Sequence, residues 1–221
     1  MSIKIESLSK RIRGVDVLKD ISLNIASGQV VGLAGPNGSG KTMLMRCIAG
    51  LISPTSGQIE INGGILGRDF AFPPSIGLLI EGPAFLSGRS GVENLRLLAS
   101  IREIASEEEI RDVIEAVGLD PSDKRPVRKY SLGMKQRLGI AAAVVERPDI
   151  VILDEPTNAL DAAGIKMAKR VVAEQKKRGA EVVLSCHDAQ VLHEMVDEVY
   201  YFAEGHMDGH ETLNNVGGPN A

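Results

Sequence analysis

One stretch decides the fold of this chain: Gly35-Pro36-Asn37-Gly38-Ser39-Gly40-Lys41-Thr42. It matches the pattern G-x-x-x-x-G-K-[ST] in full, and it lies between an apolar run of strand length, 30–34, and a helix-forming run, 43–49. This order of strand, glycine-rich loop and helix is typical of a phosphate-binding loop. A glycine-rich turn without a ligand is the alternative, but it explains neither the Lys nor the Thr. The stretch therefore predicts a protein that binds a nucleoside triphosphate.

Each residue type in this loop has a chemical reason. Gly35, Gly38 and Gly40 let the backbone approach a phosphate closely with its N–H groups pointing inward, where side chains would collide. The N-terminus of the following helix adds partial positive charge. Lys41 supplies a mobile charge for the β- and γ-phosphates, and the Thr42 hydroxyl suits Mg²⁺, a hard cation that prefers oxygen ligands. We expect the loop to hold the nucleotide and, through Thr42, its Mg²⁺.

Composition limits the partners and the location of the protein. The chain has 221 residues, 43% of them hydrophobic, which favours a single domain with an inserted lobe. Its net charge of −4 argues against a nucleic-acid-binding surface. No stretch approaches the roughly 18 apolar residues needed to span a bilayer, and Cys47 and Cys186 fit a reducing compartment better than a disulfide. We therefore expect a soluble, cytoplasmic protein that binds no nucleic acid.

The hydrophobic pattern predicts the order of the secondary structure. Apolar and polar residues alternate at 3–8 and 21–25, as in half-buried antiparallel strands. From 82 to 148 the pattern is helical, with a capping-box sequence at Ser106–Glu109. Further strands are expected at 30–34, 57–63, 75–80, 150–154, 181–185 and 197–203, and helices at 40–51, at 161–178 and from 188.

These elements predict an α/β fold with a mostly parallel sheet, an N-terminal antiparallel β subdomain and an inserted helical subdomain. A single domain is expected over 1–212. Residues 1–81 and 149–212 would form its core, and 82–148 its helical subdomain. The tail 213–221 is expected to be disordered.

Two acidic residues and a histidine are predicted at the same edge of the sheet as the phosphate-binding loop. Asp154 and Glu155 follow the apolar run 150–153, where burying a charged residue costs free energy unless it has a partner or a function. His187 follows the apolar run 182–184. At the carboxyl edge of a parallel sheet, Asp154 would face Mg²⁺, and Glu155 would lie beside the γ-phosphate as the general base for the attacking water. The alternatives are a helix N-cap or a solvated strand end for the acids, and an ordinary surface or core role for His187.

The sequence between Gly35 and His187 resembles the nucleotide-binding subunit of an ABC transporter, a branch of the P-loop NTPases. Residues 130–137, YSLGMKQR, are similar to that family's signature, L-S-G-G-Q followed by K/R-Q-R. Residues 158–161 and 185–187 match the family's D-loop and switch region. With IGLLIEGP upstream, the signature is similar to that of the bacterial branch that contains bacitracin and lantibiotic exporters.

The resemblance implies an ATPase that works as a pair of chains. Two chains would associate head to tail with two ATP molecules between them, each held by residues 35–42 of one chain and by Ser131 and Gly133 of the other. The helical subdomain would transmit opening and closing of the dimer to a separate membrane permease, which would hold the protein on the inner face of the cell membrane. The cargo, and the choice between a homodimer and a paired ATPase chain, stay open. The catalytic residues that the resemblance implies are Glu155, His187 and Lys41.

The chain departs from the usual pattern of the family in its nucleotide contacts. Glu81 stands where the family has Gln, so we expect its carboxylate to contact Mg²⁺ unless it turns into solvent. No aromatic residue lies near Ile12 to stack on the base, so Ile12 itself is expected to touch it, with a neighbouring Arg as the alternative. Leu132 and Met134 replace the signature's first Gly and its Gln.

Two other functions fit parts of the sequence. A soluble ABC-type clamp acting on ribosomes or DNA would need two such domains in one chain, long coiled coils or a basic surface, and this chain is short and acidic. A binding module without turnover would not need Lys41, Thr42, Asp154, Glu155 and His187 together. We therefore predict the ATP-hydrolysing subunit of an ABC transporter, most consistent with an exporter.

Overall fold

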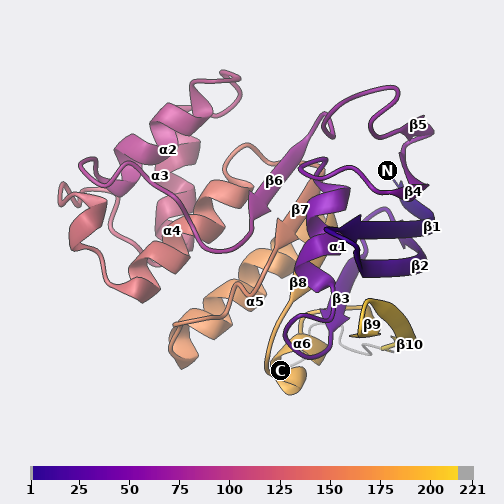
Figure 1. The fold of residues 1–221 in the computed structure, drawn as a ribbon. Helices are drawn as coiled ribbons and strands as arrows, with labels where there is room; N and C mark the ends of the chain where they lie inside the picture. Colours follow the sequence, from indigo (N-terminus) through magenta and orange to yellow (C-terminus); the bar gives the residue numbers. More distant parts are fainter. Residues whose placement is uncertain (1, 214–221) are drawn as a thin grey trace.

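The computed structural model describes residues 2–213, which form two β-sheets and a set of helices (Figure 1). The larger sheet has the strand order β10-β9-β3-β8-β7-β6. Neighbouring strands pair in parallel, except that β10 runs antiparallel to β9. Its strands are β3 (Val30–Ala34), β6 (Ile76–Leu79), β7 (Ile150–Leu153), β8 (Glu181–Ser185), β9 (Glu198–Ala203) and β10 (His206–Thr212). The mostly parallel sheet predicted from the sequence is confirmed.

The smaller sheet is the N-terminal antiparallel subdomain, with the strand order β2-β1-β4-β5. Residues in the first part of β1 are alternately exposed and buried, with apolar Ile3 and Ile5 buried, because side chains of a strand alternate between its two faces. The helix that follows the phosphate-binding loop, α1 (Lys41–Ile48), adds Leu44 to the same core. The strands are β1 (Ser2–Ile12), β2 (Val15–Ala26), β4 (Ser56–Ile61) and β5 (Gly64–Ile65).

The parallel strands are buried on both faces, which explains their unbroken apolar runs. Ile152 and Val183 belong to the core shared with α1 and the antiparallel sheet. Their neighbours Val151 and Val182 belong to a second core, on the other face, which includes residues of α4 (Leu132–Val144), α5 and α6. The bounds of the last two helices are α5 (Ala162–Lys177) and α6 (Ala189–His193).

The helical subdomain lies to one side of the sheets (Figure 1). It contains α2 (Gly91–Ala99), α3 (Glu107–Ala116), a short 3₁₀ turn (Val127–Lys129) and α4 (Leu132–Val144). The capping box predicted at Ser106–Glu109 is present, and a second one at Ser90–Glu93 begins α2. Within residues 2–213, no helix is long and apolar enough to cross a membrane.

Strand β10 was not expected from the sequence. It is an edge strand whose residues are mostly exposed, so it has no apolar pattern that would distinguish it from a loop. The adjacent Leu213 donates its backbone N–H to the Asp197 carbonyl at 2.7 Å. The rest of the tail predicted to be disordered, 214–221, lies outside the described residues.

The helical subdomain is attached to the sheet by a close contact at Gly77. This residue of β6 lies against α4, and a Cβ atom placed on it would lie 1.7 Å from the backbone oxygen of Ala143. Neither backbone can move without disturbing the β6–β7 pairing or the helix. Gly77 is therefore required by packing rather than by backbone conformation.

We predict that Gly77→Ala lowers the free energy of unfolding by about 3 kcal/mol, because the added methyl group overpacks the junction of β6 and α4. Urea unfolding followed by circular dichroism measures the change. Gly209→Ala is the matched control, since Gly209 is also a strand residue but a Cβ there would meet its nearest neighbour, Tyr201, at an ordinary 3.5 Å. Equal stabilities of the two variants would show that the contact at Gly77 is not a constraint.

Candidate active site at the carboxyl edge of the parallel sheet

A cavity of about 340 Å³ opens where β3, β7 and β8 end. Parallel strands deliver the residues that follow them to one edge of the sheet, and so residues from distant parts of the sequence meet there. The cavity is lined by Val17, Asn37, Gly38, Gly40, Lys41, Thr42, Met43, Arg46, Glu81, Asp154, Glu155 and His187. Most of the residues predicted for nucleotide, metal and catalysis are therefore brought together.

The phosphate-binding loop is held in shape by its glycines. Gly35 has φ +139°, and a Cβ there would lie 2.1 Å from the Phe202 carbonyl oxygen. Gly38 has φ +79° and nothing within 4 Å of such a Cβ, so its backbone faces open space. Lys41 bends back over the loop, where its Nζ donates to the carbonyls of Gly35 at 2.7 Å and Pro36 at 3.0 Å. These contacts place the ammonium group at the mouth of the loop.

Two of the three residues predicted to hold Mg²⁺, Thr42 and Asp154, are in direct contact. The Thr42 hydroxyl donates to Oδ2 of Asp154 at 2.7 Å. This joins the start of α1 to the end of β7 and gives two hard oxygen ligands side by side. Mg²⁺ in proteins commonly takes one or two carboxylates together with phosphate oxygens, so this donor set fits a nucleotide-bound magnesium ion.

Ser185 is a member of the site whose role is not evident from the sequence. Its hydroxyl donates to Oδ1 of Asp154 at 2.7 Å and accepts the backbone N–H of Glu155 at 2.9 Å. Ser185 is fully buried at the end of β8, so a single hydroxyl orients both acidic residues. Its position directly before Cys186-His187 in the switch region was the signal available in the sequence.

Glu155 is held in an unusual conformation for a residue with a side chain. Its φ is +51°, a left-handed conformation that costs about 1–2 kcal/mol outside glycine. The carboxylate accepts the backbone N–H of His187 at 3.0 Å, and the imidazole Nε2 lies 3.5 Å from its other oxygen. Burial raises the pKa of the Glu155 carboxyl above its ordinary value, an effect that His187 opposes in part. A raised pKa suits a general base.

Glu81 lies at the cavity but has a partner that the sequence did not reveal. It follows β6 with φ +57°, and its carboxylate forms an ion pair with the Arg46 guanidinium of α1. Glu81 therefore neither turns freely into solvent nor is committed to a metal. Arg46 comes one helical turn after Thr42, and this spacing was the signal for an additional cation near the phosphates.

The three residues outside the phosphate-binding loop that were predicted to contact the nucleotide do not line this cavity. Ile12 pairs with Val15 across the β1–β2 hairpin, and Val17 of β2 lies in the cavity instead. Ser131 and Gly133 lie at the N-terminus of α4, where the Ser131 hydroxyl accepts the N–H of Met134 at 3.2 Å. They are absent from the site of their own chain.

Comparison with known proteins decides the family. Residues 18–158 match the sequence profile described as ABC transporter. The protein belongs to the ATP-binding subunits of ABC transporters. It is therefore a P-loop ATPase that hydrolyses ATP, as the sequence predicted, and the comparisons give no support to the ribosome or DNA clamp.

The relatives of this ABC ATPase extend over nearly the whole chain. It is 42% identical to the uncharacterized ABC transporter ATP-binding protein YybJ of Bacillus subtilis, over 96% of this chain and 97% of that protein. It is 36% identical to the lantibiotic transport ATP-binding protein SrtF of Streptococcus pyogenes, over 97% and 95%. Identity to the bacitracin transport ATP-binding protein BcrA of Bacillus licheniformis is 39%, over 93% and 68%. The predicted similarity to the bacitracin and lantibiotic branch is confirmed.

Solved structures agree with the fold. The dimeric structure of MJ0796, a bacterial ABC transporter cassette, superimposes with a TM-score of 0.88 at 25% identity, covering 96% of this chain and 99% of that one. The ABC ATPase fold predicted from the sequence is therefore confirmed.

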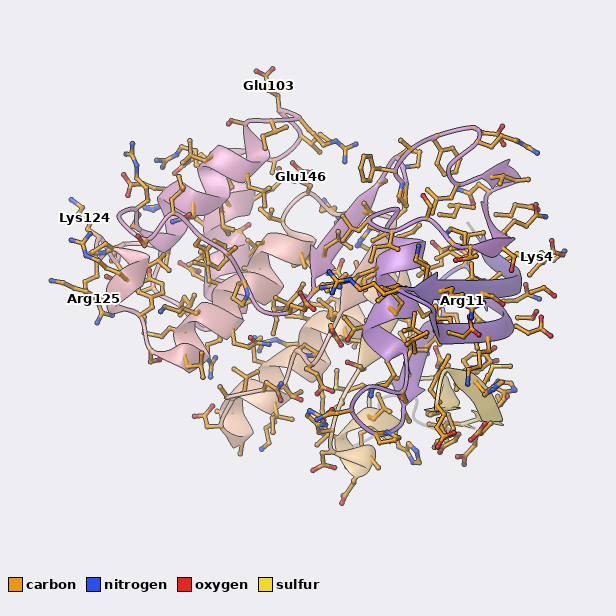
Figure 2. All side chains as sticks on the ribbon, viewed as in Figure 1. Lys4, Arg11, Glu103, Lys124, Arg125 and Glu146 are labelled. Carbon is orange, nitrogen blue, oxygen red and sulfur yellow. The ribbon has the colours of Figure 1, made fainter. Side chains whose placement is uncertain are left out.

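We predict weak discrimination between ATP and GTP. A stacked aromatic contributes about 1–3 kcal/mol per base, and this cavity offers Val17 in its place. Arg11, on the outer surface of β1 (Figure 2), donates from Nε to the Gly14 carbonyl of its own hairpin at 3.1 Å. Competition binding should give dissociation constants for the two nucleotides within about fivefold of each other. A preference for ATP above about fiftyfold would contradict the prediction, and Val17→Tyr should strengthen the binding of both nucleotides.

Proposed function

We propose that this ABC ATPase energises a membrane exporter by closing around two ATP molecules with a second ATPase chain. The observation that carries the proposal is the position of the signature. Ser131 and Gly133 lie at an exposed helix N-terminus outside their own cavity, and the intervening Leu132 side chain is 71% exposed. A helix N-terminus is a favourable place for a phosphate. These residues would complete the nucleotide site of a partner chain, either a second copy or a paired ATPase.

The chemistry would be performed by the residues at the sheet edge. The backbone N–H groups of 35–42 and the Lys41 ammonium would bind the β- and γ-phosphates. Glu155, held by Ser185 and His187, would accept the proton of the attacking water. Thr42 and Asp154 would hold Mg²⁺, which supplies charge neutralisation to the phosphates when bound.

A second surface suits the permease. An apolar groove of about 680 Å³ lies between the core and the helical subdomain, next to the loop that begins at Glu81. Leu97, Leu98 and Ile101 of the α2 region contribute to it and are 45%, 38% and 77% exposed. Apolar side chains gathered in one groove mark an interaction site. A cytoplasmic segment of the permease would occupy it, which would place this protein on the inner face of the membrane.

The groove and the active site share one loop. Glu81 lines the nucleotide cavity, and the residues directly after it, from Gly82 to Leu86, line the groove. Movement of the permease segment would therefore reach the nucleotide through a few residues of backbone. This arrangement supports coupling between transport and hydrolysis.

We predict that Glu155→Gln lowers kcat by about 10²–10⁴-fold while ATP binding stays intact, because the amide keeps the shape of the side chain but cannot take a proton. ATP should then accumulate at a closed interface, and light scattering should show twice the monomer mass when MgATP is added. Glu103→Gln is the matched control, since Glu103 has a similar φ of +55° and lies at the far end of the helical subdomain (Figure 2). Turnover by Glu155→Gln at the parental rate would exclude Glu155 as the base.

We predict that Glu81→Gln raises the Mg²⁺ concentration needed for half-maximal ATPase activity and strengthens the binding of metal-free ATP. A carboxylate attracts Mg²⁺ more strongly than an amide does, and its charge repels the γ-phosphate. The substitution also frees Arg46, whose guanidinium would then face the phosphates without a counter-ion. Magnesium titrations at fixed ATP measure both effects. Superimposable curves would show that Glu81 does not contact the metal.

A further inference from the structure

Helix α4, which begins within the signature, contacts the loop that contains Glu155 of the same chain through one side chain. Gln136, in the second turn of α4, donates from Nε2 to the backbone carbonyl of Glu155 at 2.9 Å. Gln136 is buried, with only 8% of its surface exposed. A buried amide makes such a bond with little competition from water, so the contact fixes the carbonyl strongly.

The peptide groups on both sides of Glu155 are therefore held. Its N–H is bound by Ser185 from β8, and its carbonyl is bound by Gln136 from the helical subdomain and by the Asn158 N–H at 3.2 Å. A left-handed residue with a side chain persists only where its surroundings fix it. Since φ and ψ set the direction of the side chain, these bonds also set where the carboxylate points.

We propose that Gln136 is a positioning residue for the general base, and that its hydrogen bond makes the orientation of Glu155 depend on the docking of α4. The inference rests on the proposed role of Glu155 as the base. Gln136 does not reach the nucleotide cavity, so it acts through the backbone of Glu155 and not on the substrate.

Two neighbouring contacts hold α4 against the same segment. A Cβ on Gly133 would lie 2.9 Å from the carbonyl oxygen of Ala159, so the helix start and the D-loop are packed closely. One turn later, Arg137 donates from Nη2 to Asp161 at 3.1 Å and from Nη1 to the Val117 carbonyl at 2.9 Å. Contacts before and after Gln136 on α4 therefore fix its position relative to Glu155.

The consequence concerns communication between two nucleotide sites. The same helix begins at Ser131, which the proposed dimer presents to the partner's ATP, and carries Gln136 little more than one turn further on. A shift of α4 on binding the partner's nucleotide would change the support of the base in its own chain. Each chain's base would thus respond to the occupancy of the other site.

The test removes the donor while keeping the volume. Gln136→Met fills the same space without an N–H group, and Gln136→Glu keeps the shape but brings an acceptor to the Glu155 carbonyl. We expect kcat to fall ten- to hundredfold in both variants, with the KM for ATP within about twofold of the parent and one ATP bound per chain. Binding stoichiometry, measured by fluorescence titration with a nucleotide analogue, separates a misplaced base from a smaller folded fraction.

The matched control is Gln175→Met. Gln175 is also 8% exposed and on a helix, and its Oε1 accepts from Arg178 Nε at 2.7 Å far from the cavity. This variant should keep kcat within about twofold of the parent. The proposal is overturned if either Gln136 variant retains the parental kcat, or if Gln175→Met loses as much. A separate result, parental turnover by Glu155→Gln, would show that the proposed base is wrong.

Discussion

The hydrogen bond between the Thr42 hydroxyl and the Asp154 carboxylate is the contact on which the site depends. It joins the first turn of α1 to the end of β7, which are far apart in the sequence. The two meet because β3, which precedes α1, and β7 both run parallel to β8 between them. Ser185 extends the same chain of bonds to β8 and to Glu155. The residues proposed for metal binding and proton transfer are thus joined in one small network at the sheet edge.

Two acidic residues at the cavity that come directly after strands have a left-handed backbone. Glu81 after β6 and Glu155 after β7 both have positive φ although neither is glycine. Such conformations are unfavourable in isolation and are retained where the surroundings fix them. The Glu81 carboxylate forms an ion pair with Arg46, and Glu155 is held by Ser185, His187 and the helical subdomain. Both residues line the nucleotide cavity, and the residues directly after Glu81 line the apolar groove.

The inserted helical subdomain is more than a separate lobe beside the core. It is attached to β6 through Gly77, to the D-loop through Gly133 and Arg137, and to the catalytic loop through Gln136. These contacts belong largely to one helix, α4, which also presents the signature to the outside. The helix therefore connects the proposed interface with a second chain to the interior of the candidate active site.

The sequence by itself determined the phosphate-binding loop, the acidic pair Asp154–Glu155 and the order of the buried strands, because these depend on local spacing and on apolar runs. It did not reveal β10, since an exposed edge strand lacks an apolar pattern. Nor did it reveal the partners Ser185, Arg46 and Gln136, whose roles come from strands and helices that meet only in the folded chain. Motifs of neighbouring residues can be recognised in the sequence itself. The residues that hold a functional group in place are far away in the sequence, and only tertiary packing brings them within hydrogen-bonding distance.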